Sequence, residues 1–178
     1  MRLQIVERRK WGVNEIEILN LYSKYSDMIY RIAISFLRQP QDAEDVVQAV
    51  FMKLIEGRAQ AEMGKERAFL TSITINHCKD LLRSAWKRRI VPLGEIEELY
   101  TFEHEEDSDL FHAVMELPYK LRIVIHLHYY EGYNFSEIGS LLRISSSAVS
   151  MRLHRAKKLL KNNFREDGNY AKKLQANI

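Results

Sequence analysis

The sequence predicts an all-α protein of two small helical domains joined by an acidic linker. Its 178 residues include only 3 prolines and 7 glycines, and no stretch sustains the alternation of apolar and polar residues that is typical of strands. Apolar residues recur instead at helical spacings. Eight carboxylates, with no Lys or Arg among them, fall in 90–109. We therefore expect domains over 1–89 and 110–178, joined by a linker over 90–109 that charge repulsion extends.

Composition points to a cytoplasmic protein. The 46% hydrophobic and 29% charged content is ordinary for a soluble globular chain. Cys78, the single cysteine, has no partner for an internal disulfide, and no apolar run is long enough to cross a membrane. The first ten residues lack the apolar core of a signal peptide. No membrane insertion is expected.

Two amphipathic helices are expected in the first domain, over 15–37 and 42–55, with a break at Pro40. Three carboxylates open the second helix, where they complement the helix dipole. Asp42, Asp45 and Gln48 form a strip apart from the apolar stripe, which favours a docking surface, although good capping explains the carboxylates too. No nucleophile or glycine-rich loop completes a catalytic site there. The expected apolar residues are Ile16, Leu19, Tyr22, Met28, Ile29, Ile32, Ala33 and Phe36 of the first helix, and Val46, Val47, Val50, Phe51, Leu54 and Ile55 of the second.

A basic helix is expected over 65–89, which contains seven Lys and Arg residues and only two carboxylates. It mixes charge with uncharged hydrogen-bonding groups such as Asn76 and with the aromatic rings of Phe69 and Trp86. Such a mixture suits single-stranded bases, which need stacking planes and groups that read base edges. The alternative is that these rings belong to the core.

The second domain is expected to begin with helices over 110–117 and 119–129, with a core of its own. Leu121, Val124, Ile125 and Tyr129 form the stripe of the second of these helices. His126 and His128 do not predict a zinc site, because residues two apart point to different sides of a helix.

The stretch from Asn134 to Lys158 has the pattern of a helix-turn-helix. Asn134 and Glu137 form the Asn-led analogue of a capping box. Gly139 leaves room for another backbone to approach closely. Arg143 begins the turn, and Ser145 is the expected N-cap of the next helix.

The second helix of this motif has one apolar and one polar face. Its apolar face carries Val149, Leu153, Ala156 and Leu160. Short polar residues followed by cations suit a helix that reads bases in the major groove and contacts phosphates behind them. An ordinary helical hairpin with a solvated basic face is the alternative. The polar face carries Ser146, Ser147 and Ser150, followed by Arg152, Arg155, Lys157, Lys158 and Lys161.

Three motifs, in order, resemble the extracytoplasmic-function sigma factors of bacterial RNA polymerase, members of the sigma-70 family. The first is the run from Asp42 to Gln48 followed by Phe51, which is similar to the family's polymerase-binding helix. The second runs from Arg67 to Arg83, like the promoter-melting helix. The third combines Leu117-Pro118 with the helix-turn-helix and includes Tyr130-Glu131-Gly132-Tyr133. Phe69 and Arg143 stand where family members commonly carry tryptophan and glycine.

The resemblance implies an alternative sigma factor that directs promoter-specific transcription initiation without a catalytic residue, metal or cofactor. Its partners would be core RNA polymerase, promoter DNA as duplex and as melted non-template strand, and an anti-sigma factor. The implied polymerase contacts are Asp42, Asp45 and Gln48. The implied minus-10 contacts are Asn76, Lys79 and Arg83, with the loop over 57–64, and the minus-35 contacts are Ser146, Ser147, Ser150, Arg152 and Arg155. The other function considered is a stand-alone helix-turn-helix regulator with a sensing N-terminal domain; an enzyme ranks below both.

Overall fold

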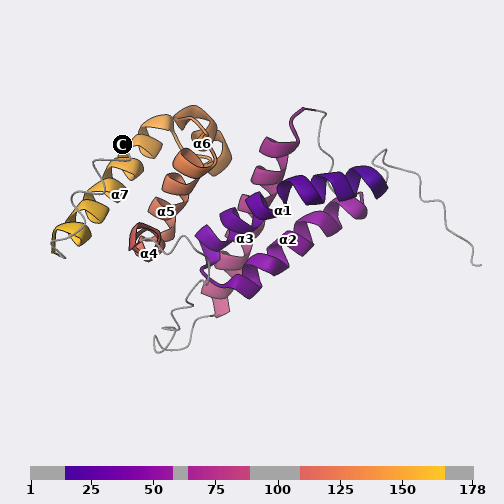
Figure 1. The fold of residues 1–178 in the computed structure, drawn as a ribbon, viewed down its shortest axis with the longest axis horizontal. Helices are drawn as coiled ribbons and strands as arrows, with labels where there is room; N and C mark the ends of the chain where they lie inside the picture. The colour runs from indigo at the N-terminus through magenta and orange to yellow at the C-terminus, as the bar shows by residue number, and fades with distance from the viewer. Residues whose placement is uncertain (1–14, 58–63, 89–108, 167–178) are drawn as a thin grey trace, which may run out of the picture.

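The protein is entirely helical in the residues that the computed structural model describes, 15–57, 64–88 and 109–166 (Figure 1). This confirms the predicted fold class. The predicted linker lies outside the described residues except for Asp109. The elements are α1 (Glu15–Leu37), α2 (Pro40–Ile55), α3 (Glu66–Arg88), α4 (Asp109–Glu116), α5 (Tyr119–Ile125), the π-helix η1 (His126–Tyr130), α6 (Phe135–Leu142) and α7 (Ser146–Glu166).

The first domain is an antiparallel α1–α2 hairpin against which α3 packs. Arg38 closes the end of α1 in a left-handed conformation, with φ 63°, and Pro40 starts α2. The interior matches most of the predicted stripes. Four expected stripe residues are exposed instead, against expectation: Ile16, Leu19, Tyr22 and Ile55. Of these, Tyr22 still packs its ring against Phe51 of α2, with the ring centroids 4.9 Å apart.

The second domain folds α4 and α5 against α7, with α6 crossing α7 to complete the helix-turn-helix. The helix predicted over 119–129 becomes a π-helix after Ile125. The N–H of Glu131 donates to the carbonyl of His126 at 3.1 Å, five residues back. This wider turn shifts the buried face. Leu127 is therefore fully buried, whereas Tyr129, which was predicted to lie in the stripe, is 52% exposed.

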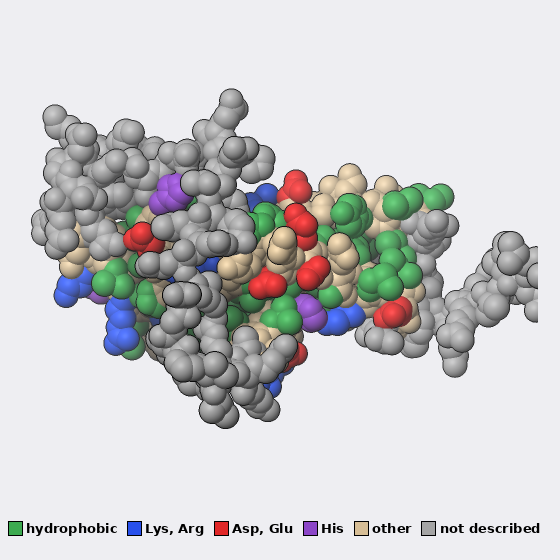
Figure 2. Space-filling model, turned by 90° about the horizontal axis from the view of Figure 1, so that it is seen from below, with side chains coloured by type: hydrophobic (Ala, Val, Ile, Leu, Met, Phe, Trp, Pro, Cys, Tyr) green, Lys and Arg blue, Asp and Glu red, His purple; other side chains and the backbone are tan. Residues whose placement is uncertain are grey.

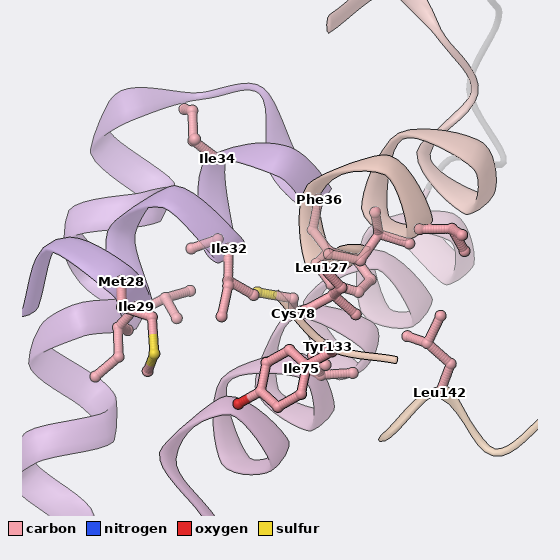
Figure 3. Close-up of a cluster of buried hydrophobic side chains, with 14 of the residues drawn as sticks. Met28, Ile29, Ile32, Ile34, Phe36, Ile75, Cys78, Leu127, Tyr133 and Leu142 are labelled. Atoms are coloured by element: carbon pink, nitrogen blue, oxygen red, sulfur yellow. The ribbon is translucent and has the colours of Figure 1, made fainter. Parts of the chain in front are cut away.

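The two domains share one core. Buried side chains of α1 and α3 continue into those of η1 and α6 without a break. Figure 3 shows Leu127 and Tyr133 of the second domain beside Phe36 of α1 and Ile75 of α3. The sequence predicted two domains with separate cores. The shared core is therefore the main difference between the expected and the observed architecture.

Arg122 of α5 lies at the centre of the domain contact and is 2% exposed. Its guanidinium donates to the carbonyls of Ser35 and Phe36 near the end of α1, and to those of Met115 and Leu117 at the end of α4. Helix ends leave such carbonyls without a partner inside the helix. Burial, and to a smaller extent the charge of Arg38, lowers the pKa of Arg122 to about 10. The side chain therefore remains charged at neutral pH.

Replacing this side chain should destabilise the whole chain. We expect Arg122→Leu to lower the free energy of unfolding by about 2 to 4 kcal/mol, because buried carbonyls lose their donors. Urea denaturation followed by circular dichroism measures the change. Lys120→Leu, at an exposed position on the same helix, is the matched control and should shift stability by no more than about 0.5 kcal/mol. Equal stability of the two variants would show that Arg122 does not stabilise the contact between the domains.

Candidate protein and nucleic-acid interfaces

The first candidate interface is the strip on α2. Asp42, Asp45 and Gln48 are all exposed, while Val46 and Val50 on the other side of the helix are fully buried. The helix begins at Pro40 rather than at residue 42, so only Asp42 lies in its first turn. Capping therefore does not explain the carboxylate of Asp45. On the face drawn in Figure 2, acidic side chains gather over the first-domain half.

The second candidate interface is one face of α3. Asn76 and Arg83 are exposed, and Arg83 is paired with Asp80 at 2.6 Å. Lys79 differs, because its ammonium donates to the carbonyl of Leu142 in the helix-turn-helix at 3.2 Å. The pKa of Lys79 is lowered by burial and then by the neighbouring positive charges of the second domain. The three predicted residues therefore lie on one face of α3, but the second domain partly covers the side chain of Lys79.

The helix-turn-helix follows the predicted local chemistry. The side chain of Asn134 accepts from the N–H groups of Ser136 and Glu137 at 2.9 and 3.0 Å, and Glu137 accepts from the N–H of Asn134 at 2.8 Å. A Cβ on Gly139 would lie 2.7 Å from the carbonyl oxygen of Ile144. This position therefore needs glycine because the backbone of the turn at Ile144 approaches α6 so closely.

The turn between the two helices uses a left-handed residue. Arg143 has φ 59° and ψ 50°, the conformation that glycine adopts at least cost. The N–H of Ile144 donates to the carbonyl of Gly139 at 2.9 Å. Ser145 then accepts from the N–H of Ala148 at 3.2 Å, which confirms its predicted role as N-cap.

The outer face of α7 is accessible near its start. Ser146, Ser147, Ser150 and Arg155 are exposed and Arg152 is half-buried. The opposite face is anchored in the core, where Val149 and Ala156 are fully buried and Leu153 and Leu160 are nearly so. Ser146 and Arg155 therefore face solvent from a helix whose opposite side is held in the core.

Sequence reasoning missed a charged cluster around Glu131, whose side chain is 3% exposed. Arg31 and Arg67 of the first domain reach its carboxylate at 3.5 and 3.1 Å, and His126 Nε2 lies 3.3 Å away. Burial by itself would raise the pKa of Glu131, but its neighbours His126, Arg67 and Arg31 hold it below the usual range. The signal in the sequence was an acidic residue following an apolar run. Its partners, however, lie 64 and 100 positions away.

A second missed contact pairs hydroxyl groups across the domains. Thr71 Oγ1 of α3 and the hydroxyl of Tyr133 are 3.0 Å apart, and both residues are buried. The guanidinium of Arg67 also lies over the Tyr133 ring, 5.0 Å from its centroid. The segment after η1 is thus fixed to α3 by charge, hydrogen bonding and packing together.

Fold and surfaces define a two-domain helical protein that contains a helix-turn-helix and a separate exposed acidic strip. The family model "Sigma-70 region 2" matches residues 21–88, and "Sigma-70, region 4" matches 108–160. The RNA polymerase sigma factor SigV of Bacillus subtilis is 30% identical over 135 residues, covering 74% of this chain and 81% of SigV. The chain belongs to the sigma-70 family and, within it, to the extracytoplasmic-function sigma factors.

Further similarities agree with this assignment. The ECF RNA polymerase sigma factor SigW of Bacillus subtilis is 24% identical, covering 80% of this chain and 86% of SigW. The fold is similar to the sigma factor RpoE in its complex with the anti-sigma factor NepR from Bartonella quintana, with a TM-score of 0.66 at 20% identity, covering 84% of this chain and 97% of that one. Among the described helices, none is both long and apolar enough to span a membrane.

The left-handed turn makes a specific stability prediction. Arg143→Gly should raise the free energy of unfolding by about 1 kcal/mol, because it removes the steric cost of a left-handed non-glycine residue. Arg143→Ala is the matched control, since it deletes the side chain but keeps the strain. Thermal denaturation of both variants gives the comparison. A gain in the alanine variant as large as in the glycine variant would refute the strain argument.

Proposed function

We propose that this sigma factor, working in the cytoplasm and without catalytic chemistry of its own, divides promoter recognition between its two domains. The first domain, residues 1–89, binds core RNA polymerase and reads the minus-10 element. The second domain, residues 110–178, reads the minus-35 element, and the linker over 90–109 connects the two domains. The observation that carries the proposal is the anchored recognition helix α7, whose polar face is exposed while Val149 and Ala156 are fully buried.

The acidic strip of α2 is the proposed polymerase contact. Asp42, Asp45 and Gln48 project from a helix whose opposite side is fixed in the core. Charged and amide groups on a rigid helix give orientation and specificity to an association more than raw affinity. An anti-sigma factor is a second expected partner, because one solved structure with a similar fold is the sigma factor RpoE in complex with the anti-sigma factor NepR.

DNA contacts are divided by chemistry. Asn76, Lys79 and Arg83 of α3 would contact the melted non-template strand, because amide and cationic groups suit exposed base edges and phosphates. Ser146, Ser147, Ser150, Arg152 and Arg155 of α7 would contact the duplex at minus-35, where the first turn of a recognition helix reaches base edges and cations behind it contact phosphates.

Charge reversal on the acidic strip tests the polymerase contact. We expect Asp45→Arg to weaken binding to core polymerase at least about tenfold, and to reduce promoter-specific transcription in proportion, with helix content unchanged. Purified core polymerase with and without each variant provides both measurements. Glu116→Arg makes the same charge change at an exposed site of the second domain and should behave like the wild type. If Asp45→Arg binds as the wild type does, the strip is not the docking surface.

Alanine substitutions of Arg152 and Arg155 in α7 should weaken DNA binding in different ways. A base contact should cost about 1 to 3 kcal/mol and relax specificity at one position, whereas a phosphate contact should lower the salt slope by about one. Arg152→Ala and Arg155→Ala are compared on duplexes selected from a random library by the wild-type holoenzyme. Lys120→Ala, exposed on α5, is the control. Unchanged affinity and salt slope in both arginine variants would place the reading surface elsewhere.

A further inference from the structure

A lysine and a histidine meet across the contact between α2 and α3, outside the residues assigned to either interface. Lys53 lies in the last turn of α2, and its Nζ is 3.3 Å from Nδ1 of His77 on α3. Both side chains are half-buried. A cation in the last turn stabilises a helix by itself, but that role gives the ammonium no fixed direction. Here the ammonium points at an imidazole ring.

The contact sets the protonation state of His77. An ammonium only donates hydrogen bonds, so Nδ1 accepts and the proton of the neutral ring is on Nε2. Burial, and then the charge of Lys53, lower the pKa of His77, whereas Asp80 raises it. Among the described residues, α1 and α6, which also pack against α3, add no charge to this shift. The ring is therefore neutral at neutral pH, and protonation of Nδ1 would place two cations in contact.

The surroundings of the pair favour an anion. Asp80, the carboxylate that acts on His77, is already paired with Arg83 at 2.6 Å. Lys53 therefore leaves a net positive charge beside the ring. A phosphate oxygen accepts strong, charge-assisted hydrogen bonds from an ammonium and from a protonated imidazole. A phosphate at this position would thus replace one weak contact with two stronger ones.

The place of His77 on α3 indicates which anion fits. His77 follows Asn76, an exposed residue proposed to contact the minus-10 element, and successive helix residues are about 100° apart around the axis. A nucleotide whose base reaches Asn76 can therefore turn its phosphate toward α2, where Lys53 lies. Polymerase groups that complement the acidic strip of α2 are basic, so they do not fit a cationic pair.

We propose that Lys53 and His77 together bind a phosphodiester of the melted non-template strand, and that His77 takes up a proton from solvent as the strand binds. The proposal rests on the proposed function for the identity of the strand. It places a DNA contact on α2, the helix otherwise assigned to polymerase. A bound phosphate offsets the repulsion between the two cations and raises the pKa of His77. The added affinity is therefore complete below the lowered pKa of the free chain and is lost above the pKa of the complex.

The direct test is the titration of His77 in the full-length chain. NMR of isotope-labelled histidine rings follows it, and His77→Gln identifies its signal. A single-stranded DNA of mixed sequence and about 20 nucleotides should raise the pKa of His77. Fluorescence anisotropy with the same DNA should show binding at least about threefold tighter at about pH 5.5 than at about pH 8, after division by the same ratio for His77→Gln.

Three variants separate the roles of the two side chains. His77→Gln keeps an acceptor for Lys53 but cannot be protonated, so the tightening at low pH should disappear. His112→Gln removes an imidazole from α4 and is the matched control, which should keep the pH response of the wild type. Lys53→Gln should weaken binding at both pH values and lower the salt slope by about 0.7, the contribution of one phosphate contact in a single strand. Circular dichroism checks that each variant is folded.

Four results would overturn the proposal. One is a pKa of His77 that the single strand leaves unchanged, and another is a pH response of His77→Gln equal to that of His112→Gln. A third is an equal rise of the pKa with a duplex of the same sequence or with inorganic phosphate at the same phosphate concentration. The fourth is a loss of pH dependence in the binding of His77→Gln to core polymerase but not to DNA, because the pair would then contact protein.

Asn76→Ala and Arg83→Ala distinguish this proposal from the function it rests on. If both variants bind the single strand as the wild type does, the assigned minus-10 face fails. The titration of His77 still decides whether the pair of Lys53 and His77 binds a phosphodiester.

Discussion

The guanidinium of Arg122 is the constraint on which the arrangement of the two domains depends. A charged group that is 2% exposed must have its N–H groups satisfied, and here four backbone carbonyls do so. Two belong to the end of α1 and two to the end of α4. The same contacts that satisfy the buried charge therefore satisfy helix ends in both domains, and neither domain retains all of them when they separate.

The domain contact is polar as well as apolar. Beside the shared apolar core, it contains Arg122, the Glu131 cluster and the hydroxyl pair of Thr71 and Tyr133. Separation of the domains would expose the shared apolar core to water and would break these hydrogen bonds, so both kinds of contact stabilise the packed arrangement.

Features set by neighbouring residues were predictable from the sequence. The capping box at Asn134, the close approach at Gly139 and the cap at Ser145 all depend on residues within a few positions of each other, and the structure has each of them. Arg122 and Glu131 were missed because their partners lie up to 87 and 100 positions away. Moreover, any residue type can supply a backbone carbonyl, so the sequence does not mark the positions that accept hydrogen bonds from Arg122. The π-helix was missed because its hydrogen bonds span five residues instead of four, which breaks the helical periodicity that predicts the buried face of an α-helix.

The central claim is that the two domains of the free chain pack against each other through the shared core and the hydrogen bonds of Arg122. Spin labels at Asn20→Cys and His154→Cys, both exposed positions, report the distance between the domains by double electron–electron resonance. Cys78 can stay in place, because it is fully buried and burial raises the pKa of its thiol to about 12. The account predicts a single short and narrow distance distribution for the free protein. A broad distribution with no dominant short distance would contradict it.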